Sequence, residues 1–112
     1  MPYITTAELA ERPGARELAQ VATAEHRPIV DTELMDATLR GGDRSKWSAA
    51  DQADADVAMA RVLDAVAEAD ALIDGFLAKR GYALPLDPVH PLVAAWCRAI
   101  ARYMLHKNRT TL

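Results

Sequence analysis

The sequence feature that most constrains the fold is one uninterrupted helical pattern from Ser48 to Arg80. Ser48 is a favourable N-cap, aspartates follow it, and Lys79 and Arg80 stand at the far end, so the charges match the helix dipole. Gly81 is typical of the residue that ends such a helix. The helix would be roughly 50 Å long, whereas a compact domain of this size measures about 35 Å across. We therefore expect the helix either to break near residues 53–58 or to project beyond the body of the protein.

One side of this long helix is apolar. Stepping about 100° per residue along the pattern places seven apolar residues within about one third of the circle: Met59, Val62, Val66, Ala69, Ile73, Phe76 and Leu77. Charged residues fall on the opposite side: Arg61, Asp64 and Glu68. Asp70 and Asp74 lie beside the apolar stripe, with Asp70 nearer to burial. We predict that the stripe packs against the remaining helices.

Three shorter helices are predicted before it. Thr5 and Glu8 match a capping box, which predicts a short helix that stops at the Pro-Gly pair 13–14. A second helix is predicted over residues 15–23. A third covers residues 31–40, because it starts with an aspartate cap and ends before two glycines.

The last helix is predicted over residues 91–106, after a stiff connection that is rich in proline. Six apolar residues share one of its faces: Leu92, Val93, Trp96, Ile100, Tyr103 and Met104. Arg98 and Arg102 share the opposite side, one turn apart. Residues 107–112 are predicted to be a flexible tail.

These patterns predict a single all-α domain over residues 1–112. It is a small helical bundle with one long central helix and a C-terminal helix joined to it by the Pro-rich turn. The chain has 23 alanines but only 24 Leu, Ile, Val and Phe residues together, so helices are favoured more strongly than a large core. Self-association is a natural way for such a chain to bury more surface.

Composition excludes several classes of function. The net charge of −3 argues against nucleic-acid binding, which draws on a surplus of Lys and Arg. The single cysteine, Cys97, allows no internal disulfide and is expected to be a small core residue. The first residues do not follow the pattern of a signal peptide, and no apolar stretch is long enough to span a membrane.

The acidic residues have a structural interpretation. Asp51, Asp54 and Asp56 resemble a cation site only superficially, because they lack the glycine turn and the distal glutamate of an EF-hand. Asp70 and Asp74 lie one turn apart but have no nucleophile near them in sequence, so we expect structural pairing, with Asp70 facing an arginine.

Metal and enzyme chemistry find little support. Cys97 and His106 are nine residues apart and fall on opposite sides of a helix, and His26 and His90 lie in or beside loops. A phosphate-binding loop, a nucleophile elbow and an HExxH motif are all missing from the sequence. We expect no enzyme activity, no cofactor and no metal.

Two regions are candidates for contact with a partner or with another copy. Trp47 stands between Arg44 and Lys46 on one side and Ser48 on the other, in the polar loop 41–47. An exposed tryptophan is often a contact anchor, but Trp47 could equally pack locally as a staple for the long helix. Arg98 and Arg102 form either a patch for an acidic partner or an ordinary solvated face.

Several stretches resemble the Mu-like prophage small protein family of phage head–tail connector (adaptor) proteins. They are ADALIDGFL at residues 69–77, YALPL at 82–86, IARY at 100–103, YITTAEL at 3–9 and ELAQ at 17–20. The chain departs from the family pattern in two places. Residues 24–58 are longer than the usual connection and are predicted to be an insertion, and Gly81 separates the expected Arg-Tyr pair.

The resemblance implies a structural protein without catalysis. It would form a ring of about a dozen copies between the portal protein and the tail or head-completion proteins, complete the capsid and let DNA pass without specific binding. Such a protein would reside in the virion neck, and in the bacterial host cytoplasm during assembly, with no membrane partner.

Two other functions remain open on the residues alone. The first is a small helical regulatory or interaction module of a bacterium, which would be a stable monomer or dimer. The second is a small metal-dependent enzyme, which rests only on scattered acidic residues and histidines.

Overall fold

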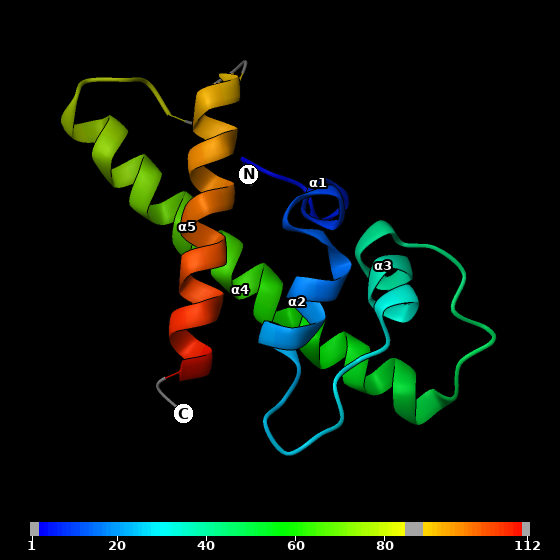
Figure 1. Ribbon diagram of the computed structural model, residues 1–112. Coiled ribbons are helices and arrows are strands. Elements are labelled where there is room, and N and C mark those ends of the chain that lie inside the picture. The colour runs from blue at the N-terminus through cyan, green and yellow to red at the C-terminus, as the bar shows by residue number, and fades with distance from the viewer. Residues whose placement is uncertain (1–2, 85–88, 111–112) are drawn as a thin grey trace.

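In the computed structural model the described residues are 3–84 and 89–110, and for 109 and 110 only the backbone is described. Over these residues the chain is all-α, as predicted, with no strand (Figure 1). The α-helices are α1 (Thr6–Leu9), α2 (Ala15–Ala22), α3 (Thr32–Arg40), α4 (Ala49–Lys79) and α5 (Pro91–Thr110), and a π-helical turn, η1 (Ala10–Gly14), joins α1 to α2. The predicted Pro-rich turn falls partly on residues 85–88, which lie outside the described residues.

Three helices begin at the caps that the sequence predicts. Thr5 Oγ1 accepts a hydrogen bond from the Glu8 amide, and the Glu8 carboxylate accepts one from the Thr5 amide, which completes the capping box of α1. Asp31 and Ser48 cap α3 and α4 by accepting a hydrogen bond from the amide three residues later. A cap of this kind stabilises a helix by about 1 kcal/mol.

The helix ends also follow local chemistry. Gly41 after α3 and Gly81 after α4 have φ of 71° and 85°, a region that favours glycine. The first helix stops close to the predicted Pro-Gly pair at 13–14. After Leu9 the chain continues as a π-helical turn over Ala10–Gly14, and Arg12, which precedes a proline, takes an extended conformation and kinks it.

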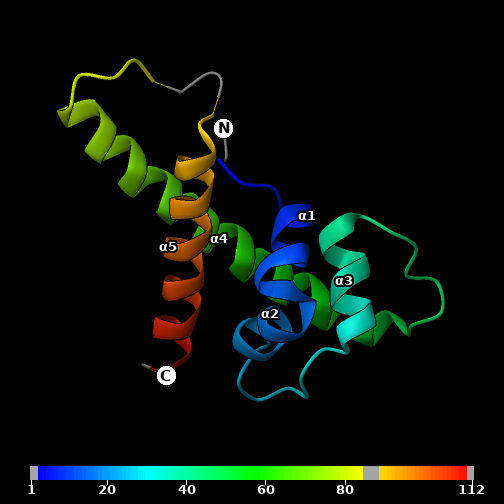
Figure 2. The same ribbon diagram turned by 45° about the horizontal axis from the view of Figure 1, so that its top comes forward.

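The long helix α4 is continuous. Of the two alternatives expected from the sequence, the helix therefore projects beyond the body and does not break. Its 31 residues run along a molecule that measures 48 × 31 × 18 Å. Helices α1, α2 and α3 gather around its N-terminal half, and α5 crosses its C-terminal half and also contacts α2 (Figures 1 and 2). We call residues 3–70 the body, and residues 71–84 with 89–110 the arm.

The core is continuous but unevenly filled. Its largest fully buried side chains are Ile4, Leu9, Leu18, Leu34, Met35, Val62, Thr23 and Cys97. All of these except Cys97 belong to the body. The α3 helix, which lies in the predicted insertion 24–58, supplies Leu34 and Met35, so part of this segment belongs to the core of the protein.

The predicted apolar stripe of α4 is mostly correct. Val62, Val66, Ala69, Ile73 and Leu77 are buried. Met59 is only partly buried, and Phe76 is 50% exposed, which corrects the prediction for Phe76. The physical reason is that the arm has a single helix packed on α4, and one helix covers a narrower stripe than the three helices of the body do.

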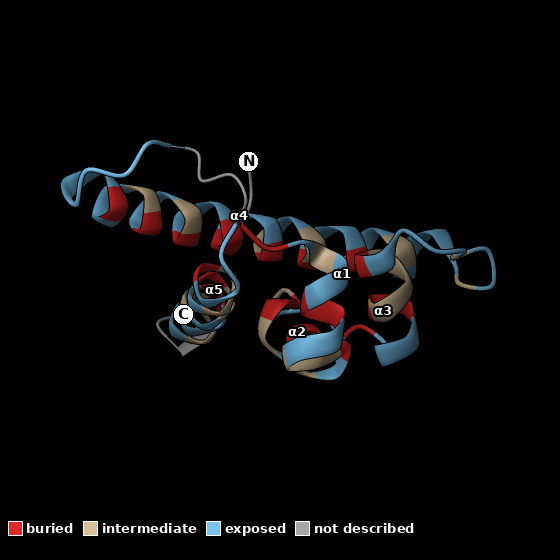
Figure 3. Ribbon diagram, turned by 90° about the horizontal axis from the view of Figure 1, so that it is seen from above, coloured by how far each residue is buried: buried red, intermediate tan, exposed pale blue. Residues whose placement is uncertain are grey.

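The apolar face that the six residues of α5 share is mostly not its buried side. The buried residues are Val93, Cys97, Ala101 and Leu105, whereas Leu92, Trp96 and Tyr103 are exposed and Ile100 and Met104 are partly buried. Figure 3 shows that α5 is buried on its side toward α4 and exposed on its outer side. Small side chains at Cys97 and Ala101 let α5 approach its neighbours closely, so they replace the bulkier residues at the contact. The helix also continues through Thr110, so residues 107–110 are helical rather than a flexible tail. Residues 111–112 lie outside the described residues.

Candidate interaction surfaces

The loop 41–47 is fastened to the N-terminal end of α4. The Gln52 side-chain amide donates hydrogen bonds to the carbonyls of Arg44 and Trp47, at 2.9 and 3.0 Å. Arg44 forms an ion pair with Asp56 at 2.6 Å. Trp47 is partly buried against the core, and the Lys46 ammonium lies 4.6 Å from its ring centroid. Of the two interpretations of Trp47, its packing agrees with a local staple at the start of α4. A contact role for this loop stays a prediction.

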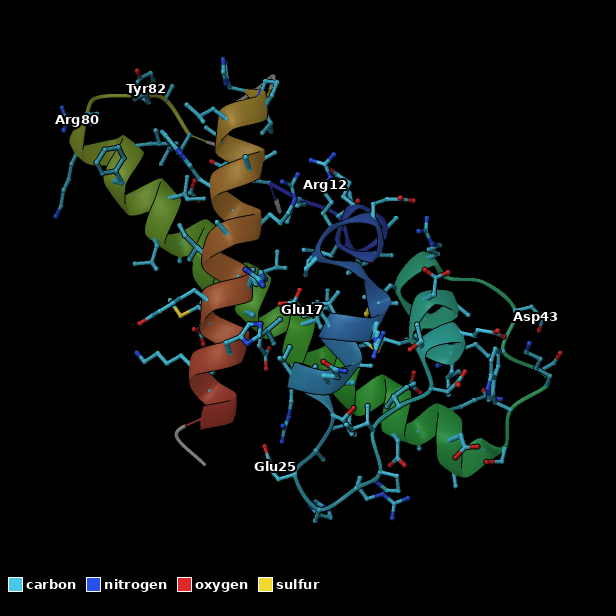
Figure 4. The ribbon with its side chains drawn as sticks, in the orientation of Figure 1. Arg12, Glu17, Glu25, Asp43, Arg80 and Tyr82 are labelled. Carbon is cyan, nitrogen blue, oxygen red and sulfur yellow. The ribbon has the colours of Figure 1, made fainter. Side chains whose placement is uncertain are left out.

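Arg102 connects the arm to the body. Its Nε donates a hydrogen bond to Glu17 Oε1 at 2.6 Å, and His106 Nε2 lies 2.7 Å from the same oxygen. Glu17 stands on α2 and faces α5 (Figure 4). Partial burial by itself raises the pKa of Glu17, but the hydrogen bonds from His106 and Arg102 outweigh it, so the pKa lies below the ordinary value.

Arg98 lies in a different environment from Arg102. It is half-buried, and its Nε is buried without a hydrogen-bond acceptor within the described part of the chain. The structure therefore does not bring the two arginines together as one solvated patch, since Arg102 is paired with Glu17 and Arg98 points its Nε inward.

Asp70 and Asp74 hold the N-terminal segment against α4. The Tyr3 amide donates a hydrogen bond to Asp70 Oδ1 at 3.0 Å, and the Tyr3 hydroxyl donates one to Asp74. Cys97 Sγ also donates to Asp70, at 3.3 Å. We expected Asp70 to face an arginine, and this expectation is wrong. Its carboxylate instead accepts hydrogen bonds from a backbone amide and a buried thiol.

Cys97 is the buried small residue that the sequence predicts. Burial, followed by the hydrogen bond and the charge of Asp70, raises the pKa of the thiol to about 12. The thiol is therefore protonated at neutral pH and chemically quiet.

The acidic start of α4 is built into ion pairs. Asp54 pairs with Arg27 at 3.0 Å, and Asp56 pairs with Arg44. Among the described residues no group of three His, Cys, Asp or Glu side chains is placed to hold a metal ion. No described helix has the length and apolar character that a membrane span requires.

An apolar groove between α4 and α5 was missed by the sequence reasoning. It encloses about 380 Å³ and is lined by Leu72, Ile73, Phe76, Trp96, Ala99 and Ile100. At its rim the Arg80 guanidinium lies 5.2 Å from the centre of the Phe76 ring. One signal could have revealed the groove: α5 carries apolar residues on two opposite faces, and one neighbouring helix can cover only one of them.

Comparison with known protein families identifies the family of the chain. No curated protein and no solved structure is significantly similar to the chain. The family described as Bacteriophage Mu, Gp36 matches residues 3–111, which include both the body and the arm. The chain is therefore a phage protein and a member of the Bacteriophage Mu Gp36 family.

Proposed function

We propose that the protein is a structural head–tail connector, or adaptor, of a tailed phage or prophage. It forms a ring of about a dozen copies between portal and tail in the neck of the virion, completes the capsid and lets DNA pass. Membership of a phage family supports the phage setting. The connector role rests on the resemblance of the sequence stretches 69–77, 82–86 and 100–103 and on the physical features of the arm.

The observation that carries the proposal is the uncovered apolar surface of the arm. Leu72, Phe76, Leu92 and Trp96 are each between 41% and 53% exposed. They line two hollows between α4 and α5, and Phe76 and Trp96 belong to both. A contiguous apolar surface of this kind on a small protein marks a contact site with another protein. An assembly subunit needs such a surface because its stability and its role are completed by its neighbours.

The charge of the chain agrees with a channel through which DNA moves. The net charge of −3 gives no electrostatic grip on phosphates. A subunit of a DNA passage that bound the duplex tightly would slow its movement.

A phage or prophage that carries this chain allows a direct test. With a nonsense codon in the gene, electron microscopy is expected to show DNA-filled heads and separate tails in place of complete particles. Purified protein added to that lysate should restore joined, infectious particles. Complete particles without the protein would overturn the connector role, as would purified protein that fails to bind a portal ring from the same phage.

An interaction module is the second candidate, because the same groove has the shape and lining that would receive one amphipathic helix. The interaction-module function predicts a monomer or dimer that binds a helical peptide and does not bind the portal. Binding to the portal ring, measured by co-sedimentation, separates the two candidates.

A further inference from the structure

The exposed side of α5 is built like a helix contact. Leu92, Trp96, Ala99 and Tyr103 recur at alternating spacings of four and three residues, and all four are exposed. We call them the α5 stripe. Residues at this spacing share one side of a helix, and here that side is turned away from the buried residues of α5. A helix with apolar residues on opposite sides is normally covered on both.

The outer face of α4 carries a second stripe of different character. Ala53, Val57, Ala60, Asp64 and Ala67 follow the same alternating spacing and are exposed. We call them the α4 stripe. We call its three alanines, Ala53, Ala60 and Ala67, the alanine channel, because their short side chains leave room for the bulky side chains of another helix. In Figure 3 the outer edge of α4 is exposed along one side of the molecule, and α5 lies on the other side.

Charge divides the chain into two unequal parts. Residues 71–112 carry six Lys or Arg and two Asp, a net charge of +4, whereas residues 1–70 carry seven Lys or Arg and fourteen Asp or Glu, a net charge of −7. Figure 4 shows Arg80 in the arm and Asp43 in the body at opposite ends of the molecule. Two carboxylates, Asp64 within the α4 stripe and Glu68 beside it, are exposed and form no hydrogen bond or ion pair within the described residues.

We propose that the α5 stripe of one copy packs on the α4 stripe of a second copy. Trp96 and Tyr103 would fill the alanine channel, and the basic arm would lie against the carboxylates of Asp64 and Glu68. Opposite charge favours this pairing, whereas contact between two arms or between two acidic bodies would bring like charges together. A second copy is thus the occupant that the charges favour.

The two stripes are different surfaces on opposite sides of the molecule, so the contact is head to tail. A contact of this kind leaves one free stripe of each type and repeats until the assembly closes. The inference deepens the proposed function and rests on it for closure into a ring, but the pairing of the two stripes is tested separately.

The test uses two variants of the full chain that each block one stripe. W96E/Y103E places charge on the α5 stripe, and A60R/A67R fills the channel of the α4 stripe. The control is Ile29→Glu, an equally exposed apolar position in the loop between α2 and α3. Circular dichroism and thermal unfolding confirm that all three are folded, since every changed residue is exposed.

Sedimentation velocity over a concentration series gives the readout. Wild type and the Ile29→Glu control are expected to form oligomers larger than dimers, and each blocking variant is expected to self-associate about 30-fold more weakly. An equimolar mixture of the two blocking variants should form one-to-one heterodimers and stop there, because the mixture holds one intact stripe of each type per pair.

Three outcomes would overturn the inference. They are a wild type that remains monomeric at every concentration, blocking variants that associate as strongly as the wild type, and a loss of association in W96E/Y103E alone, which would indicate contact between two α5 stripes. Co-sedimentation with the portal ring is measured on the same samples. Portal binding by single copies would refute the pairing of the stripes and leave the connector role standing. Intact oligomers that do not bind the portal would support the pairing and refute the connector role.

Discussion

The body and the arm differ in how completely they bury their apolar side chains. In the body, four helices surround Leu34, Met35 and their neighbours, which have almost no contact with solvent. In the arm, two helices cross, the buried residues of α5 are mostly small, and Phe76 and Trp96 remain about half exposed. The body therefore buries its largest apolar side chains, whereas the arm leaves its largest ones exposed.

The two regions also differ in how their charges are used. Most charged side chains around α3 and the start of α4 are joined in ion pairs within the body, such as Arg27 with Asp54 and Arg44 with Asp56. The arm has a surplus of basic residues, and one of them, Arg102, pairs with Glu17 of the body. Many charges of the body are thus paired within it, whereas the arm keeps a net positive charge.

The sharpest test of this contrast compares one substitution in both regions. Leu34→Ala removes a fully buried side chain from the body and should lower the free energy of unfolding by about 3 kcal/mol. Leu72→Ala removes the same atoms from a position that is 53% exposed and should cost about 0.5 kcal/mol or less. Urea unfolding of the dilute protein measures both. Equal losses would show that the arm contributes as much core as the body.

The joint between the regions gives the next largest effect. Asp70→Ala removes the carboxylate that accepts the hydrogen bonds of the Tyr3 amide and the Cys97 thiol. A buried donor that loses its partner costs about 2 kcal/mol, so the unfolding midpoint should fall. Asp64→Ala, an exposed aspartate on the same helix, is the matched control and should change it little. An unchanged unfolding midpoint in Asp70→Ala would mean that this contact does not hold the N-terminal segment.

The Glu17 contact predicts a dependence on pH. Because the folded protein lowers the pKa of Glu17 below its ordinary value of 4.5, the contact stabilises the fold above that value. The stabilisation is lost as the pH falls through the lower pKa of the folded state. Glu17→Gln should therefore cost about 1 kcal/mol at neutral pH, and its deficit should shrink in acid. A deficit that stays constant with pH would point to packing rather than charge.

The smallest effect is expected in the loop 41–47. The Lys46 ammonium lies over the Trp47 ring and pairs with Glu33, and the side chains of Lys46 and Glu33 are exposed. Lys46→Ala should change the free energy of unfolding by only about 0.5 kcal/mol. Any marked loss of portal binding or of self-association in this variant would then report a contact role for the loop. Unchanged assembly would remove Lys46 from the candidate contacts.

What could be predicted from the sequence was mainly local. The caps at Thr5, Asp31 and Ser48 and the glycines after α3 and α4 depend on hydrogen bonds and backbone angles within a few residues. The structure therefore confirms them. The stop of the first helical segment at Pro13 is local in the same way, because Arg12, which precedes the proline, leaves helical geometry.

The faces of α5 could not be predicted in the same way, because both sides of this helix are apolar. A helical wheel finds the bulky stripe with Trp96 and Tyr103, but it does not show which side a neighbour will cover. Packing selected Cys97 and Ala101, whose small size lets the helices approach. The partner of Asp70 was missed for a related reason, since Tyr3 lies 67 residues away in sequence.

The continuity of α4 has a mechanical consequence. The helix has no proline and no break over its 31 residues, so it forms a stiff strut about 46 Å long that is shared by both regions. A load applied at the Arg80 end reaches the loop 41–47 through one element without a hinge. A subunit built on this strut tilts as a unit, and the strain of assembly would then be taken up at the contacts between subunits.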